Sequence, residues 1–149
     1  LRVDHRLLHG QVVYSWCSQI KPNCILVAND EVVENEIRKA ALRLAKPNET
    51  KLVFKNINDS VTAINEGKTD KYDLMIVVNN IEDAVKLAEQ CPQVSSINLG
   101  GTKANELTHA ISNMVNVTTE EELLLKKIVA QGIEVFLQGV PSEQKKEYR

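Results

Sequence analysis

Residues 24–30 are Cys-Ile-Leu-Val-Ala-Asn-Asp, five apolar residues followed by two polar ones. A short apolar run rich in branched side chains predicts a strand that is buried on both faces of a sheet. Strands of this kind are typical of parallel sheets that helices cover on both sides. Similar runs occur at residues 51–54, 74–78, 96–99 and 133–137, and residues 1–3 are expected to be the clipped end of a first strand.

Segments with helical periodicity separate these runs. One helix is expected at residues 11–20, with Trp16 facing the core or an interface. Asp30 is expected to cap the next helix, whose apolar face would consist of Val33, Ile37, Ala41 and Leu44. The remaining helices are expected to start, by their capping residues, at Asn58 or Asp59, at Asn80 and at Thr118.

This alternation of strands and helices predicts the α/β class. We expect a single three-layer domain over residues 1–149, with a mainly parallel central sheet and helices on both faces. Residues 100–117 interrupt the rhythm, and a short extra strand is expected from residues 110–111 and 114–115. The tail at residues 142–149 is expected to be a solvated face or a helix.

Composition excludes some classes of function. The 149 residues include 18 Lys and Arg against 20 Asp and Glu, a net charge of −2. Nucleic-acid-binding proteins normally have a basic excess, so we expect no nucleic-acid partner. No apolar run approaches the roughly 18 residues that a membrane-spanning helix needs. Three cysteines without a CxxC pair favour a reducing cytoplasm, and Cys17 and Cys24 are expected to be buried thiols.

The stretch richest in reactive side chains follows the first strand, at residues 4–11 (DHRLLHGQ). In such sheets, ligands bind beyond the carboxyl ends of the strands, where helix N-termini converge. His9 is expected at the start of the first helix, where backbone N–H groups favour an anion and a neutral imidazole. Arg6 could contact phosphate oxygens, and Asp4 could orient an imidazole N–H. These residues suit a histidine that receives and passes on a phosphoryl group; the alternative is a polar loop residue.

Other motifs are less specific. His5 and His9 have the i,i+4 spacing of metal ligands, but the HExxH glutamate is missing, and no metal site is expected. A GxGxxG motif is also missing, and no cofactor is expected. Gly100-Gly101 is either a tight turn or a close approach of backbone beside the His9 loop. The pairs Asn29-Asp30 and Asn79-Asn80 are explained by helix capping, with pocket lining as the alternative.

Residues 2–12 (RVDHRLLHGQV) closely resemble a family motif. The motif, roughly R-[IV]-D-x-R-L-[IL]-H-G-Q-[VI], is the active-site loop of the IIB component of the mannose/sorbose family of the bacterial phosphoenolpyruvate:sugar phosphotransferase system. The strand that ends in Asn29-Asp30 and the segment at residues 98–101 (NLGG) are similar to further features of that family. His5 stands where many members carry aspartate.

The resemblance implies a phosphocarrier. His9 would be phosphorylated at Nδ1 by a phosphohistidine of a IIA component, and would pass the group to a sugar held by the membrane components IIC and IID. Arg6 is implied as a phosphate contact, and Asp4, Gly10 and Gln11 belong to the same motif. The protein would be a protein-phosphohistidine–sugar phosphotransferase in the cytoplasm, peripherally associated with the membrane transporter. Whether it forms a homodimer is left open.

Two other classes of function stay open. One is a flavodoxin-like small-anion binding module in which the His9 loop binds its ligand without covalent phosphorylation. The other is a receiver-type signalling domain, which needs an aspartate acceptor. Asp30 follows a strand, but the acidic cluster of such domains is lacking at the end of the first strand. Transfer of isotopic phosphate onto the chain separates a carrier from a binding module.

Overall fold

The computed structural model describes residues 1–148, apart from the side chain of Gln11. Its helices are α1 (Gly10–Ile20), α2 (Glu36–Ala45), α3 (Ile57–Asn65), α4 (Ile81–Gln90) and α5 (Thr119–Ala130), with a 3-10 turn at Val32–Glu34. Its strands are β1 (Arg2–Asp4), β2 (Cys24–Ala28), β3 (Lys51–Lys55), β4 (Leu74–Val78), β5 (Ser96–Gly101), β6 (His109–Ala110), β7 (Asn116–Val117), β8 (Glu134–Leu137) and β9 (Lys146–Glu147).

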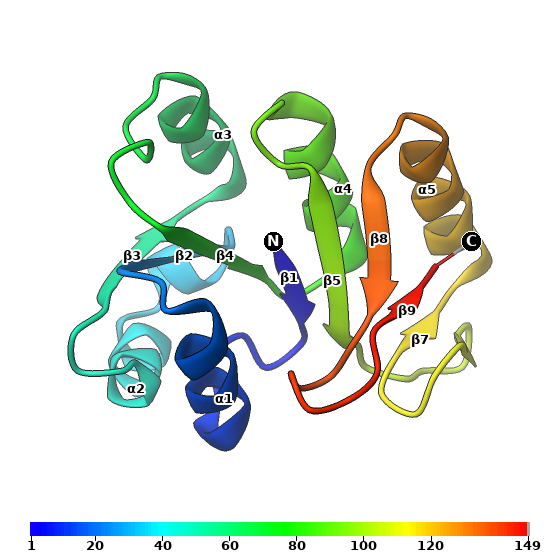
Figure 1. Cartoon of the computed structure of the whole chain (residues 1–149), viewed down its shortest axis with the longest axis horizontal. Helices are drawn as coiled ribbons and strands as arrows, with labels where there is room; N and C mark the ends of the chain where they lie inside the picture. Colours follow the sequence, from blue (N-terminus) through cyan, green and yellow to red (C-terminus); the bar gives the residue numbers. More distant parts are fainter. Residues whose placement is uncertain (149) are drawn as a thin grey trace.

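A seven-stranded sheet forms the middle layer, in the order β3-β2-β4-β1-β5-β8-β9 (Figure 1). Its neighbouring strands are parallel, except that β9 runs antiparallel to β8. Figure 1 shows α3, α4 and α5 on one side of the sheet and α1 and α2 on the other. The predicted α/β class with a mainly parallel sheet is confirmed. None of the helices in the described part of the chain is long and apolar enough to cross a membrane.

Alternating side chains of the central strands pack into two separate hydrophobic cores, one on each face of the sheet. Leu26 and Ile76 belong to the larger core, which includes buried residues of α3, α4 and α5. Ile25 and Val77, one position away on the same strands, pack with residues of α1 and α2. Successive side chains of a strand point to opposite faces, so an unbroken apolar run supplies both cores at once.

Several predicted boundaries agree with the structure. The strands at 24–28 and 74–78 have the expected bounds, Asn80 caps α4 and Thr118 caps α5. Asn56, rather than Asn58 or Asp59, caps α3 by accepting a hydrogen bond from the Asp59 N–H at 2.7 Å.

The predicted helix after Asp30 is wrong in its cap and in its apolar face. A 3-10 turn intervenes, and Asn35 caps α2 by accepting a hydrogen bond from the Arg38 N–H at 2.9 Å. Ile37 and Leu44 lie within α2 but are 85% and 90% exposed, and the buried residue of the helix is Leu42. Asp30 instead accepts a hydrogen bond from the Ile57 N–H, at the start of α3, at 2.8 Å.

The second half of the chain brings two further corrections. The extra strand expected in residues 100–117 is a pair, β6 and β7, joined in antiparallel register one or two residues from the expected positions. The tail is neither a helix nor only a solvated face, because β9 pairs with the edge of β8 and Tyr148 is buried. Of the cysteines, Cys24 is buried as expected, whereas Cys17 is only partly buried.

We expect Leu87→Ala to destabilise the fold by about 2–5 kcal/mol, the usual cost of truncating a fully buried leucine. Leu87 of α4 is 0% exposed, whereas Leu44 of α2 is 90% exposed. The matched variant Leu44→Ala should change the free energy of unfolding by no more than about 0.5 kcal/mol. Urea titration of both variants measures the difference, and equal midpoints would contradict the placement of α4 against the core.

Candidate functional site

The loop between β1 and α1 leaves the carboxyl edge of the sheet at its centre, where β1 lies between β4 and β5. Leu7 and Leu8 fasten this loop to the core, since their exposed fractions are 2% and 4%. Leu7 adopts a φ of 60°, the left-handed region that costs a residue with a side chain about 1–2 kcal/mol. Its burial offsets that cost and holds the loop in one conformation.

Asp4 and His9 lie in direct contact at the two ends of this loop. The Oδ2 atom of Asp4 is 3.0 Å from Nε2 of His9, and its Oδ1 accepts a hydrogen bond from the Arg6 backbone N–H at 3.0 Å. An ionised carboxylate can only accept hydrogen bonds, so Nε2 of His9 must carry a proton. In a neutral imidazole the lone pair then lies on Nδ1. The His9 side chain is 20% exposed and the Asp4 side chain 3%.

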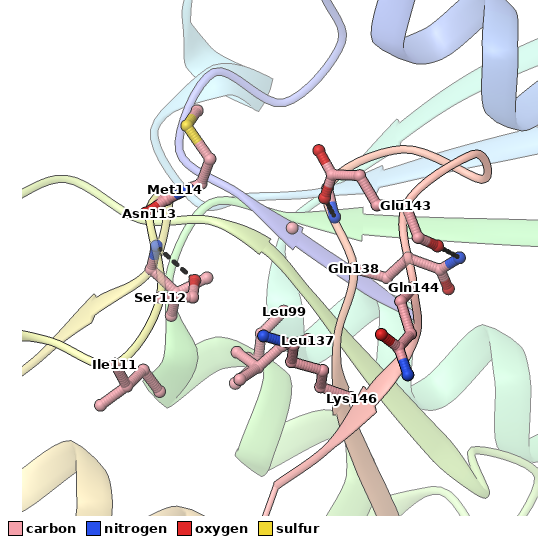
Figure 2. A pocket seen from close by; sticks show the side chains of 13 residues that line it. Leu99, Ile111, Ser112, Asn113, Met114, Leu137, Gln138, Glu143, Gln144 and Lys146 are labelled. Atoms are coloured by element: carbon pink, nitrogen blue, oxygen red, sulfur yellow. Dashed lines mark hydrogen bonds between the residues drawn. The ribbon is translucent and has the colours of Figure 1, made fainter.

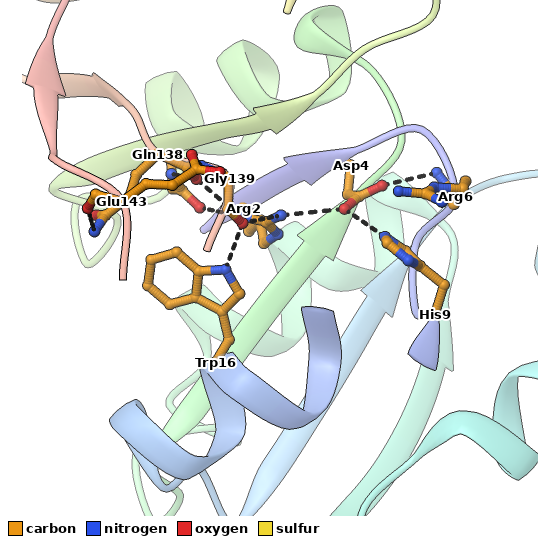
Figure 3. Close-up of polar contacts among 9 residues, drawn as sticks. Arg2, Asp4, Arg6, His9, Trp16, Gln138, Gly139 and Glu143 are labelled. Carbon is orange, nitrogen blue, oxygen red and sulfur yellow. Dashed lines mark hydrogen bonds and ion pairs between the residues drawn. The ribbon is translucent and has the colours of Figure 1, made fainter. Parts of the chain in front are cut away.

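Arg2 contacts the same oxygen of the Asp4 carboxylate as His9 does (Figure 3). Its Nη2 lies 3.2 Å from Oδ2 of Asp4, and its Nη1 donates to the side-chain oxygen of Asn98. The backbone carbonyls of Gln138 and Gly139 accept further hydrogen bonds from the same guanidinium, at 3.2 and 2.9 Å. Burial lowers the pKa of Arg2, and the neighbouring Asp4 opposes this shift.

The remaining residues predicted for the site are placed less tightly. The Arg6 side chain is exposed, and among the described residues it forms no ion pair with a carboxylate. It is the backbone of Arg6, and not its guanidinium, that contacts Asp4. His9 is the N-cap of α1 with extended backbone, and Gly10 begins the helix with a φ of 32°. The predicted role of the Gln11 side chain lies outside the described residues.

The other two histidines have different surroundings. His109 is exposed on β6, and its Nε2 lies 2.7 Å from Oε1 of Glu122. His5 follows Asp4, and its backbone N–H donates to the Gly101 carbonyl at 3.0 Å. The Nδ1 atom of His5 is buried and has no hydrogen-bond partner within residues 1–148.

Gly100 and Gly101 lie in β5, and are not a tight turn. The alternative, a close approach of backbone beside the His9 loop, holds at Gly101, whose carbonyl accepts a hydrogen bond from the His5 N–H at 3.0 Å. A Cβ atom on Gly100 would overlap the guanidinium of Arg2. A Cβ atom on Gly101 would meet only ordinary contacts, the nearest being Nδ1 of His5 at 3.6 Å.

A pocket of about 440 Å³ opens at the same edge of the sheet, between the loop at 111–115 and the segment at 138–146 (Figure 2). Leu99 and Leu137 line its apolar side. Gly100 and Gly139, which surround the Arg2 guanidinium, also line it. Asn29 is not the N-cap of the 3-10 turn, which is Glu31; its Oδ1 accepts hydrogen bonds from the Glu31 and Val32 N–H groups at 3.1 and 2.9 Å.

Arg2 and Asn98 lie in the stretches that resemble the family, but no role at the site was predicted for either from the sequence. A signal was available, because a charged residue on a strand expected to be buried on both faces needs a partner of opposite charge. The partner of Arg2 stands two residues later, at Asp4. The carbonyls at Gln138 and Gly139 gave no such signal, because every residue has a backbone carbonyl and its residue type does not show which one accepts a hydrogen bond.

Fold and site together define a parallel α/β domain with a carboxylate-backed histidine at the carboxyl edge of its sheet. The chain belongs to the family described as "PTS system sorbose subfamily IIB component", which matches residues 1–149. The resemblance noted in the sequence is confirmed. Components of this family are phosphotransferases, and the chain is a phosphocarrier in sugar uptake. They work with IIA components and with the membrane components IIC and IID.

Individual relatives agree with this assignment. A "Probable phosphotransferase enzyme IIB component" of Streptococcus pyogenes is 32% identical over 97% of this chain and 93% of that protein. The mannose-specific EIIAB component of Escherichia coli K12 is 30% identical over 97% of this chain, which spans 45% of that longer protein.

Solved structures share the fold. The N-acetylgalactosamine-specific IIB component 1 of Escherichia coli has a TM-score of 0.91 at 26% identity, over 99% of this chain and 97% of that one. The IIB domain of the sorbose permease of Klebsiella pneumoniae has a TM-score of 0.90 at 23% identity, over 97% of this chain and 88% of that one. The second likeness concerns the fold alone.

Proposed function

We propose that His9 carries the phosphoryl group, taking it from a phosphohistidine of a IIA protein and giving it to a sugar bound by IIC and IID components in the membrane. The observation that carries this proposal is the 3.0 Å contact between Nε2 of His9 and Oδ2 of Asp4. It supports Nδ1 as the acceptor, because the other ring nitrogen is engaged. We further propose that the chain acts on the cytoplasmic side of those membrane components.

In both transfers, the covalent bonds of this chain change only at the His9 imidazole. The Nδ1 lone pair attacks phosphorus while the P–N bond to the donor histidine breaks, and that bond's electron pair stays on the donor imidazole. Phosphorylated His9 keeps its proton on Nε2, and Asp4 stabilises the positive charge of the ring. A sugar hydroxyl then attacks phosphorus, the P–Nδ1 bond electrons return to Nδ1, and the hydroxyl proton passes to a base at the sugar site.

Two groups provide a positive electrostatic potential that stabilises the negative charge of the phosphoryl oxygens. The first-turn N–H groups of α1 have no partner inside the helix, and a helix N-terminus favours an anion. The Arg6 guanidinium, exposed beside the loop, is free to bind two phosphate oxygens in a fork. Phosphoryl transfer depends mainly on positioning and on charge stabilisation of this kind.

Reconstitution of the phosphate cascade tests this proposal. The chain is incubated with phosphoenolpyruvate, enzyme I, HPr and a cognate IIA protein, and the modified residue is mapped by mass spectrometry. We expect an acid-labile, alkali-stable phosphate on His9, with the ³¹P resonance of an Nδ1-phosphohistidine. Binding of phosphate without covalent label would instead indicate an anion-binding module.

We expect Arg6→Ala to slow phosphorylation of His9 by on the order of 10- to 100-fold, because one charge-assisted contact is worth about 1.5–3 kcal/mol. Arg6→Lys should recover part of the rate, since lysine is a point charge without the planar fork. Arg38→Ala, which removes an exposed arginine from α2, is the control. Quench-flow kinetics with phospho-IIA measure the rates. Equal rates in Arg6→Ala and Arg38→Ala would rule out the phosphate contact.

A further inference from the structure

Arg2 is a buried charge at the centre of the sheet, and nothing in the transfer steps above uses it. The residue is 5% exposed, and both of its Nη atoms are engaged. One acceptor is the Asp4 carboxylate, and two others are backbone carbonyls at the end of β8. A guanidinium bound on several sides in this way has one available orientation, because its donors form a rigid planar fork.

We propose that Arg2 is a positioning residue for His9, which fixes the Asp4 carboxylate where it accepts the Nε2 proton and so keeps Nδ1 as the phosphoryl acceptor. This inference rests on the proposed function of His9. Oδ2 of Asp4 is shared between Arg2 at 3.2 Å and His9 at 3.0 Å. Oδ1 of Asp4 is held by the Arg6 N–H. Without Arg2, the carboxylate keeps only one fixed contact, to Oδ1, and is free to turn about it.

Gly100 makes room for this arrangement. A Cβ atom at this position would overlap the guanidinium carbon and nitrogens of Arg2. Arg2 could not stay in place, because its guanidinium is enclosed by β5 on this side and by the Gln138 and Gly139 carbonyls. Gly100→Ala therefore displaces the guanidinium while Arg2, Asp4 and His9 all remain in the chain. Gly101, the next residue of β5, has space for a methyl group.

Trp16 reports on the same arrangement. Its Nε1 donates to the Gly139 carbonyl at 2.8 Å, the carbonyl that also accepts from Arg2, and the guanidinium lies 5.3 Å from the centre of its ring (Figure 3). Trp16 is the only tryptophan of the chain, so its fluorescence has a single source. Displacing Arg2 should change the emission of Trp16.

The test compares wild type, Gly100→Ala, Gly101→Ala and Arg2→Lys. Long-range ¹H–¹⁵N NMR of the unphosphorylated chain gives the His9 tautomer, and the phosphate cascade gives the rate of phosphorylation and the ratio of Nδ1- to Nε2-phosphohistidine. Circular dichroism establishes that each variant is folded. If the role of Arg2 were purely structural, displacing it in folded protein would leave the His9 tautomer and the ratio of Nδ1- to Nε2-phosphohistidine unchanged.

We expect wild type and Gly101→Ala to have the Nε2–H tautomer and only Nδ1 phosphate. Gly100→Ala should mix the tautomers, alter Trp16 emission and lose about 10- to 100-fold in rate, the size of loss known for removing a group that orients a metal-ligating histidine. Arg2→Lys should lie between, and it replaces Gly100→Ala in the test if that variant does not fold.

The outcomes separate the two claims. If wild type takes up no phosphate while the tautomer changes in Gly100→Ala, the proposed function fails and the positioning by Arg2 stands. If wild type is phosphorylated but Gly100→Ala or Arg2→Lys keeps both its tautomer and its rate, the positioning role is overturned. Loss of rate in Gly101→Ala equal to that in Gly100→Ala would overturn it as well.

Discussion

His9→Gln should take up no acid-labile phosphate from the phosphoenolpyruvate cascade, the largest loss that we expect from any single substitution. The physical reason is that a glutamine amide nitrogen has no available lone pair to attack phosphorus. The amide can still reach Asp4, so the loop should keep its shape. Only the acceptor is then removed. Radiolabel from phosphoenolpyruvate, counted after alkaline and after acid treatment, measures the incorporated phosphate.

His5→Gln and His109→Gln are the matched controls for this result. His5 lies beside Gly101 and has no charged partner for its buried Nδ1 in the described structure, and His109 is paired with Glu122 on β6. Neither lies at the start of a helix, so neither has the N–H groups that favour a phosphate. Both variants should label like the wild type. Wild-type labelling of His9→Gln, in protein that is folded by circular dichroism, would refute the assignment of the acceptor.

The central strands and most helix ends are predictable because their signals are local. The run at 24–28 is apolar at every position, so both of its faces must be covered whatever the rest of the chain does. Asn80 and Thr118 act through hydrogen bonds to residues three positions away. Such short-range preferences are present in the sequence and survive in the fold.

The face of α2 could not be predicted in the same way. Val33, Ile37, Ala41 and Leu44 have helical spacing, yet Ile37 and Leu44 are exposed. Asn35 starts the helix two residues after Val33, and the 3-10 turn before it has a different rotation per residue. Ile37, Ala41 and Leu44 all lie within α2, so the apolar face is present, but the helix buries Leu42 instead. Periodicity identifies an apolar face and does not say whether the core covers it.

The same distinction between contacts that are local in sequence and contacts that are distant in sequence applies to the site. Asp4 and His9 are five residues apart, and the chemistry of the two side chains led us to expect that Asp4 could orient an imidazole N–H. The contacts of Arg2 with Asn98, Gln138 and Gly139 span 96, 136 and 137 residues. They exist because parallel order places β1 beside β5 and β5 beside β8, a register that only the folded sheet defines. The missed part of the site is therefore the part built by tertiary pairing.

Asp4→Asn should weaken both the fold and the phosphate transfer. The two oxygens of Asp4 accept from three donors: Oδ1 from the Arg6 N–H, and Oδ2 from Arg2 and His9. Asparagine has one oxygen, so its NH₂ group must face a donor on one side or the other. Arg2 is also left without its carboxylate in a buried place, a loss that costs about 3–5 kcal/mol when a buried ion pair is broken.

The effect on transfer should reach on the order of 100-fold or more, since the group that sets the His9 tautomer is lost. Asp30→Asn is the matched control. Asp30 follows β2 at the same edge of the sheet and uses its Oδ1 to accept from the Ile57 N–H at 2.8 Å, and an asparagine oxygen can do the same. Urea unfolding and the rate of phosphorylation are measured on both variants. If Asp4→Asn equals Asp30→Asn in stability and in rate, the carboxylate does not hold His9; a loss in Asp4→Asn alone assigns both effects to the donors that converge on Asp4.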